Sequence, residues 1–393
     1  MTRPHFAREE YAARIAKTRD AMAARDIELL FVSDPSNMAW LTGYDGWSFY
    51  VHQGVLLAQE GEPVWFGRGQ DVNGAKRTTY LGDDNDNIVG YPDEYVQSTE
   101  RHPMDYLSDV IAARGWGGAR IGVEMDNYYY AAACHASLTK HLSNAAFLDA
   151  TGLVNWQRAV KSPAELDCMR TAARIAEKVQ ARILDRVEPG LRKCDLVADI
   201  FATGIAGLPE AGGDYPAIVP LVAAGADAGA PHMTWDDTEI EVDEGIFFEI
   251  AGCYRRYHAP LCRTVYLGTP PVHYRDAETA LLEGIEAGLE AAKPGNRAAD
   301  IANGLFGALK RHGIEKDSRC GYPIGLSYPP DWGERTISFR PGDDTVLEPG
   351  MTFHFMPGLW FDDWGMEITE SIAITETGVE VLTDYPRQLF VKG

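Results

Sequence analysis

The stretch EPGLRKCDL at residues 188–196 decides the fold, because it returns 105 residues later as KPGNRAADI at 293–301. At the same offset, GIFFEI at 245–250 returns as GMTFHF at 350–355. Elements that recur in the same order at one offset are the signature of an internal duplication. The sequence therefore predicts a domain built from two equivalent halves that are related by a pseudo-twofold axis.

The two halves cover about 160–275 and 276–390, and each reads as a helix, a Pro-Gly turn, a second helix and then strands. Packed face to face, such halves bury a curved sheet under helices, which is an α+β arrangement. Side chains from equivalent strands, such as Glu249 and His354, are then expected to face one shared cavity. We place the active site in that cavity.

A separate α/β domain is expected before the duplicated one. The hydrophobic pattern predicts a helix at 6–24, a strand at 28–32, a turn at 33–37, a hairpin of 55–58 with 63–66, and a strand at 120–124. Ser162, Pro163 and Glu165 then form a capping-box signature that opens a long helix. The expected domains are residues 1–158 and 159–393.

Composition narrows the function classes. The net charge of −22 over 393 residues argues against a nucleic-acid partner, since phosphate binding requires a basic face. Six cysteines without CxxC pairing fit free thiols in a reducing compartment. The charged N-terminal stretch does not resemble a signal peptide, and no apolar run is long enough to span a membrane. We expect a cytoplasmic protein without a membrane partner.

Five segments, taken in order, resemble the pita-bread family, which includes prolidase, aminopeptidase P, methionine aminopeptidase and creatinase. They are VKSPAE at 160–165, GAPH at 229–232, Arg263-Thr264, GYPIG at 321–325 and EPGM at 348–351. The resemblance covers nearly the whole chain. It implies a creatinase-type N-terminal α/β domain followed by a C-terminal pita-bread domain.

The peptidases of this family hold two divalent metals with two Asp, one His and two Glu. The resemblance assigns these ligand positions, in order, to Glu249, Pro260, Tyr322, Met356 and Thr369. A proline ring cannot coordinate a metal, and a thioether is too soft for Mn, Co or Zn. We therefore expect no metal and no other cofactor, although Glu367 and Glu370 lie close enough in sequence to supply a carboxylate.

Losing the metal ligands while keeping His232 resembles creatinase, in which the corresponding His acts as acid and base without metal. The cation-binding Glu of creatinase falls on Cys262 here. Glu249, Tyr322, the stretch HAPLCRT at 258–264 and the aromatic loops are most similar to the ectoine hydrolases. That resemblance implies metal-independent opening of the cyclic amidine of ectoine, and of hydroxyectoine, to an N-acetyl-2,4-diaminobutyrate.

His232, Glu249 and Glu367 are the candidate catalytic residues. A histidine in a turn before a cavity can titrate near neutrality. Glu249 ends an apolar run, where a carboxylate is costly unless it meets a cation such as an amidinium. The structural alternative for Glu249 is a salt bridge to Arg255, Arg256 or Arg263.

The run EITE at 367–370 leaves a choice between two carboxylates. Strand alternation puts Glu367 and Thr369 on one face and Glu370 on the other. We favour Glu367 at the site and keep Glu370 as a substrate-binding alternative if a bulge intervenes. Cys262 beside His258 has the form of a nucleophile, but a small core residue is the better reading.

Aromatic residues are expected to bind the substrate. Trp47, Tyr50 and His52 lie where a creatinase loop reaches the neighbouring subunit's site, and their alternation equally suits an ordinary strand. An aromatic box around a planar cation is expected in the loops of the second half. Arg335 is the candidate for the substrate carboxylate. The full set of expected substrate contacts is Trp47, Tyr50, His52, Tyr322, Arg335, His354, Trp360 and Glu370.

Rival functions and partners remain open at this point. The alternatives are another creatinase-like amidinohydrolase, a residual Xaa-Pro aminopeptidase or prolidase, and a catalytically dead pita-bread binding module. For hydrolysis itself, a water attack managed by His232 and a covalent Glu intermediate both remain. We expect a homodimer, and a downstream deacetylase is the further partner considered.

Overall fold

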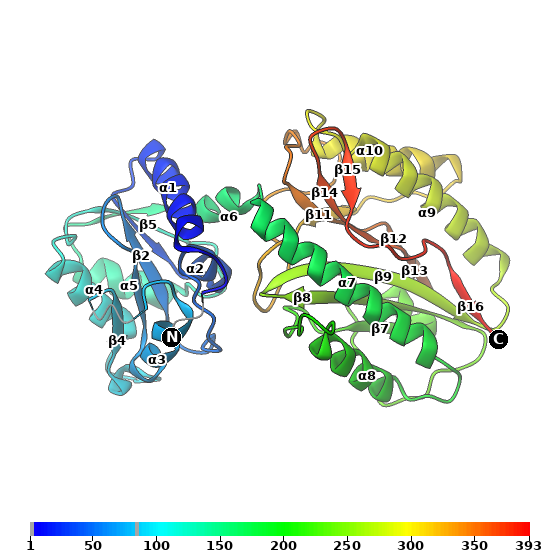
Figure 1. Ribbon diagram of the computed structural model, residues 1–393, viewed down its shortest axis with the longest axis horizontal. Helices are drawn as coiled ribbons and strands as arrows, with labels where there is room; N and C mark the ends of the chain where they lie inside the picture. The colour runs from blue at the N-terminus through cyan, green and yellow to red at the C-terminus, as the bar shows by residue number, and fades with distance from the viewer. Residues whose placement is uncertain (1–3, 83–85) are drawn as a thin grey trace. The chain divides into compact units, whose positions relative to one another are not determined.

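The computed structural model describes residues 4–82 and 86–393. The chain divides into two units, Met1–Arg158 and Ala159–Gly393 (Figure 1). In the described residues, every helix falls short of the length and apolar character that crossing a bilayer requires.

The predicted duplication is present in the second unit as two helix pairs. Helix α7 (Pro163–Arg186) and helix α9 (Val272–Ala291) end 105 residues apart. Helix α8 (Lys193–Ala206) and helix α10 (Ala298–Arg311) both begin and end 105 residues apart. The offset read from the sequence is therefore the offset of the fold.

Equivalent glycines make the turn between the helices of each pair. Gly190 has φ +83° and Gly295 has φ +88°, a region that glycine enters without steric cost. Each donates its backbone N–H at 2.9 Å, to the carbonyls of Ile240 and Leu347 respectively. The two Pro-Gly turns are thus built in the same way, which explains why this dipeptide recurs.

Helix α7 begins where the capping signature predicts. Ser162 is the N-cap and accepts from the Glu165 amide, while the Glu165 carboxylate accepts from the Ser162 amide. Pro163 occupies the first helical position. This arrangement satisfies two of the amides that a helix start leaves unpaired.

The second unit contains two four-stranded sheets, and the sheet of the first half is completed by β16 from the end of the chain. The sheet orders are β16-β9-β8-β7 and β10-β11-β14-β15, and β12 pairs with β13 in a separate hairpin. The strands are β7 (Leu221–Ala224), β8 (Glu244–Tyr254), β9 (Tyr257–Leu267), β10 (Gly321–Pro323), β11 (Thr352–Phe355), β12 (Gly358–Trp360), β13 (Gly365–Glu367), β14 (Glu370–Ile374), β15 (Val379–Val381) and β16 (Phe390–Lys392), with a 3-10 turn η3 (Gly225–Gly229). Helix α7 packs along β8 and β9, and α9 pairs with α10 (Figure 1).

The first unit is a six-stranded mixed sheet in the order β4-β3-β2-β1-β5-β6, with apolar clusters of its own. The strands are β1 (Leu29–Val32), β2 (Gly54–Ala58), β3 (Val64–Arg68), β4 (Ile88–Tyr91), β5 (Arg120–Val123) and β6 (Ala146–Asp149). The helices are α1 (Arg8–Ala24), α2 (Pro35–Thr42), α3 (Val72–Thr78), α4 (Pro103–Ala113), α5 (Ala132–His141) and α6 (Leu153–Arg158), with 3-10 turns η1 (Gly69–Asp71) and η2 (Asp93–Tyr95). The predicted hairpin is β2 with β3.

One local prediction in this unit is wrong. The segment 33–37 was expected to be a turn, but Asp34 is the N-cap of helix α2 and accepts from the Ser36 and Asn37 amides. Pro35 stands at the first helical position, where its fixed φ suits a helix start. The same Asp-Pro signal that marks turns therefore opens a helix here.

Candidate active site

Strand alternation separates two faces of β8. Ile246, Phe248 and Ile250 belong to the apolar cluster that also contains residues of α7 and α8. Glu249 lies between two of them and therefore points to the other face of the sheet. Across the β8–β9 pair it stands directly opposite Cys262. We call the side of the second unit that Glu249 faces, away from the helices, the inner face.

The second sheet repeats this separation. Phe353 and Phe355 of β11 pack in the apolar cluster that contains residues of α9 and α10. His354 between them points away from the helices and is paired in register with Tyr322 of β10. His354 Nδ1 lies 3.9 Å from Glu249 Oε1. The structure thus brings together the two equivalent-strand residues that the repeat singles out.

A buried hydrogen-bond chain holds His354. Trp332 Nε1 donates to Tyr322 Oη at 2.8 Å, and Tyr322 Oη lies 2.9 Å from His354 Nδ1. Burial lowers the pKa of His354 to about 3, so the ring is neutral. We infer that Tyr322 donates to Nδ1 and that Nε2 carries the ring proton. That Nε2 is buried, with no hydrogen-bond partner among the described residues.

Glu367 of β13 is the second carboxyl group on the inner face. It is 1% exposed, and in the described structure neither carboxylate oxygen has a hydrogen-bond partner. Burial raises its pKa to about 7, although the nearby Cys262 thiol and Lys316 ammonium oppose the rise. Buried polar atoms are nearly always bonded, so this carboxyl group is suited to bind a ligand with hydrogen-bond donors.

Glu249 and Glu367 act on each other. Burial raises the pKa of Glu249 well above its ordinary value, and the charges of Glu367 and Asp331 raise it further. Two carboxyl groups that share a buried site cannot both ionise cheaply. At neutral pH the pair therefore retains at least one proton and is ready to bind a cation.

Lys316 supplies a positive charge beside this pair. Its Nζ lies 4.6 Å from the ring centroid of Trp360 and donates to the Gly358 carbonyl at 2.8 Å. Trp360 Nε1 is buried without a hydrogen-bond partner among the described residues. The inner face thus carries carboxyl groups together with an ammonium group, which suits a ligand that has both charges.

Glu370 is engaged away from this pair, contrary to its expected role in substrate binding. Its carboxylate accepts from Arg263 at 2.8 Å, from Arg387 at 2.9 Å and from the Thr383 hydroxyl at 2.7 Å. Together these three donors engage both carboxylate oxygens. Arg263 is consumed by the same cluster, so the alternative in which Arg263 neutralises Glu249 is wrong as well.

Cys262 does not have the surroundings of a nucleophile. Burial raises the pKa of its thiol well above the ordinary value, with Glu367 and Glu249 adding to the rise. His258 is turned to a backbone partner, since its Nε2 accepts from the Ala217 amide at 2.9 Å. The preferred reading of Cys262 as a core residue agrees with this environment.

Other expected site residues lie outside the buried group. His232 is exposed in the turn after η3, and Arg335 is exposed with φ +57°. In the first unit, Trp47 and Tyr50 are exposed and belong to an irregular segment, so the strand alternative for this stretch is wrong. His52, at its end, packs against His102.

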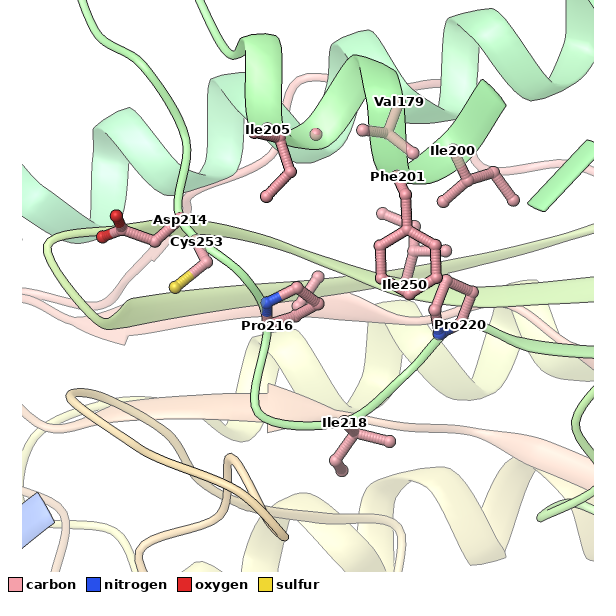
Figure 2. Close-up of a pocket in the computed structure, with 12 residues that line it drawn as sticks. Val179, Ile200, Phe201, Ile205, Asp214, Pro216, Ile218, Pro220, Ile250 and Cys253 are labelled. Atoms are coloured by element: carbon pink, nitrogen blue, oxygen red, sulfur yellow. The ribbon is translucent and has the colours of Figure 1, made fainter. Parts of the chain in front are cut away.

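A separate apolar pocket lies under the segment 214–220 (Figure 2). It is lined chiefly by aliphatic and aromatic side chains of α7, α8 and β8, among them Val179, Ile200, Phe201 and Ile250. Asp214 is its charged lining residue, and neither Glu249 nor Glu367 borders it. We therefore place the chemistry at the carboxyl pair and not in this pocket.

Comparison with known proteins identifies the family. The profile of Metallopeptidase family M24 matches residues 167–376, and that of the Creatinase/Prolidase N-terminal domain matches residues 14–160. The chain belongs to metallopeptidase family M24. Over 394 residues it is 61% identical to a protein of Halomonas elongata named ectoine hydrolase, with 98% of each chain covered.

Solved structures of M24 type share the fold. A dipeptidase PepE from Mycobacterium ulcerans aligns with a TM-score of 0.80 at 23% identity, covering 98% of this chain and 99% of its own. A prolidase from Thermococcus sibiricus aligns with a TM-score of 0.84 at 19% identity, covering 97% and 99%. The predicted α+β pita-bread architecture with a creatinase-type N-terminal domain is confirmed.

The dinuclear metal centre implied by the M24 name does not fit these residues. Of the five equivalent positions, Glu249 alone offers a carboxylate. The Thr369 hydroxyl accepts from the Cys262 amide at 2.8 Å, and the Tyr322 hydroxyl is held between Trp332 and His354. Hard divalent ions require several oxygen or nitrogen donors around one point, and this donor set does not supply them.

Sequence reasoning missed two charged residues that act on the carboxyl pair Glu249 and Glu367. Lys316 falls in the polar run EKDS, which reads as a solvated turn, and Asp331 follows two prolines in a loop. Buried Lys161 also escaped notice, although its Nζ donates to Glu334 Oε2 at 2.6 Å and so anchors the loop that carries Trp332. No periodic signal marks any of the three.

Proposed function

We propose that this chain hydrolyses the cyclic amidine of ectoine in the manner that the name of its Halomonas elongata relative implies. The observation that carries the proposal is the buried carboxyl pair, Glu249 with the unbonded Glu367. Such a pair needs a cation with hydrogen-bond donors. An amidinium offers both, since its two N–H groups match the two oxygens of a carboxylate.

Substrate binding itself would activate the pair. A bound cation lowers the pKa of the carboxyls it touches, so the amidinium ionises groups that are protonated in the free enzyme. Glu249 then holds the amidinium. Glu367 takes a proton from the attacking water as its oxygen bonds to the amidine carbon. The ring C–N bond breaks, and the departing nitrogen receives that proton.

The carboxylate of ectoine requires a cationic partner. Lys316 suits this role because its ammonium group is close enough to Glu367 to oppose the rise in the pKa of that carboxyl. It also stacks on Trp360, which the aromatic-box interpretation placed at the substrate. We propose that Lys316 binds the carboxylate of ectoine, and that the exposed Arg335 is the alternative partner of this carboxylate.

Competition between substrates tests the function. Offered ectoine, creatine and a proline dipeptide together, the protein is expected to consume ectoine and leave the other two. Creatine is disfavoured because Cys262 stands where creatinase has its cation-binding Glu, which removes a charge-assisted contact worth roughly 1.5–3 kcal/mol. Separation of the products by chromatography measures this, and hydroxyectoine can be added as a fourth substrate. Preferential loss of creatine or of the dipeptide would overturn the proposal.

Turnover is expected to survive chelation, because an amidinium carbon is already electrophilic and the inner face lacks a donor set for two metals. The measurement is ectoine turnover before and after exhaustive dialysis against a chelator, followed by addition of Mn²⁺, Co²⁺ or Zn²⁺. Activity that disappears on dialysis and returns with one of these ions would contradict metal independence.

His232→Ala distinguishes two routes for the proton. If the exposed His232 manages it, as the creatinase resemblance implies, turnover falls by about a hundredfold or more. If the carboxyl pair manages it, the loss is expected to stay below about tenfold. We expect the smaller effect because His232 is exposed whereas Glu249 and Glu367 are buried together. Steady-state kinetics at saturating ectoine decide between them.

Assembly is a further part of the proposal. A closed twofold dimer is the commonest form of soluble enzymes, and the exposed Trp47 and Tyr50 suit a surface that meets a second copy. Light scattering measures the mass of the protein in solution and is expected to give that of a dimer. A downstream deacetylase remains a proposed partner on the grounds that the product carries an acetyl group.

A further inference from the structure

In the first unit, three side chains that can bind metal come together from separate elements. His52 lies in the loop before β2, His102 caps helix α4, and Cys134 stands in the first turn of α5. Each offers a ligand atom within 4.8 Å of the other two. From this geometry we propose that His52, His102 and Cys134 form a binding site for a borderline divalent metal such as Zn²⁺.

The distances suit one metal ion. Cys134 Sγ lies 3.5 Å from His52 Nδ1. Two ligands of a tetrahedral zinc, with bonds of about 2.0 Å to nitrogen and about 2.3 Å to sulfur, lie about 3.5 Å apart. The His52 and His102 ring centroids are 4.6 Å apart. A small movement of the His102 ring therefore completes the three-ligand set.

The donor types select the class of metal. Imidazole and thiolate favour Zn²⁺ and its neighbours over the hard ions Mg²⁺ and Ca²⁺, which need oxygen ligands. The three side chains supply two imidazole nitrogens and one sulfur, and the metal displaces the thiol proton of Cys134 on binding.

Coordination has one local cost. His102 Nδ1 accepts from the Met104 amide at 3.1 Å, so the metal would bind Nε2 and the ring proton would move to Nδ1. Losing this cap is a small cost beside the stabilisation that binding of a structural metal supplies. The His102 amide still donates to Asp105, so the start of α4 remains held.

The fourth coordination position can open to a cavity. His52 and His102 line a cavity of about 160 Å³ together with Tyr50, Tyr91, Tyr95 and Arg101. Such a volume accommodates several waters, one of which can complete the tetrahedron. The ion would connect the irregular segment that holds Trp47 and Tyr50, through His52, to helices α4 and α5.

Cobalt substitution tests the site. Co²⁺ added to the chelator-treated full-length protein should give one equivalent of binding and a near-ultraviolet band from a cysteine–cobalt bond. Cys134→Ser should remove the band, and His52→Ala should weaken binding by at least about tenfold, as even losing an outer partner of a metal ligand does. Cys194→Ser, which changes a partly buried thiol of the other unit, should keep both.

Competition with Zn²⁺ should abolish the band, and Zn²⁺ should raise the melting temperature of the wild type but not of Cys134→Ser. Circular dichroism serves as the control that each variant is folded. A wild type without the band, or a Cys134→Ser protein that retains it, would overturn the proposal. The chelation assay of ectoine turnover is repeated with Cys134→Ser, which lacks the proposed site. A loss of turnover on chelation in this variant would come from a metal in the second unit.

Discussion

Glu249→Gln is expected to lower ectoine turnover by about a hundredfold to ten-thousandfold, with the fold retained. Glutamine keeps the size of the side chain but cannot carry the charge that grips an amidinium or passes on a proton. The pKa of Glu249 is raised first by burial, so the charged form of this carboxyl is disfavoured until a cation binds beside it. Steady-state kinetics and circular dichroism of the purified variant measure both effects.

The matched control is Glu244→Gln, which alters another carboxyl of β8. Glu244 is half-buried and its carboxylate accepts from the Glu241 amide at the strand start. Its turnover should remain within about twofold of the wild type. Should Glu249→Gln retain near-normal activity while folded, the carboxyl pair could not be the binding site for the amidinium.

Glu367→Gln is expected to lower turnover by a similar factor and to stabilise the protein in alkaline solution. Unfolded, this carboxyl titrates near its ordinary value of 4.5, whereas burial raises its pKa to about 7 in the fold. As pH rises from 4.5 to 7, the unfolded chain loses a proton that the folded chain keeps, so folding stability falls across that window. Above pH 7 the cost levels off at about 3 kcal/mol.

Glutamine has no such proton to lose. Thermal unfolding should therefore show Glu367→Gln melting several degrees above the wild type at pH 8 and close to it at pH 5. The exposed Glu376→Gln serves as the control and should shift neither value. In the wild type, kcat/KM should rise with pH through about 7 as Glu367 ionises. A flat pH profile together with unchanged stability would refute the assignment.

A catalytic group that destabilises its own fold is consistent with the arrangement of this site. Glu367, His354 Nε2 and Trp360 Nε1 are all buried without hydrogen-bond partners among the described residues. A protein selected for stability alone would bond or replace these atoms. Their survival on one inner face is the physical reason for placing a polar ligand there.

Several features could be predicted from the sequence because they depend on local or periodic signals. The Pro-Gly repeats predicted two halves, and helices α8 and α10 begin and end at the predicted offset. Ser162 and Glu165 predicted the start of α7 to the residue. The pseudo-twofold relation of GIFFEI and its repeat predicted that Glu249 and His354 face one shared cavity, and they lie 3.9 Å apart.

Local signals failed where one pattern suits two structures. The residues around Asp34 and Pro35 satisfy both a turn and a helix start, and the helix is what forms. In the run 367–370, alternation indicated correctly that Glu367 and Glu370 point to different faces. It did not show that Arg263, Arg387 and Thr383 would engage both oxygens of Glu370.

The sequence by itself determined the duplicated scaffold and the equivalence of the strand residues Glu249 and His354. Only the tertiary structure decided which charges meet. The charge of Asp331 raises the pKa of Glu249, and the charge of Lys316 lowers that of Glu367. These groups meet only because β8, β13 and the loops of the second half pack together. The raised pKa of the carboxyl pair comes first from burial, and burial is a property of the packed fold, not of any stretch of chain.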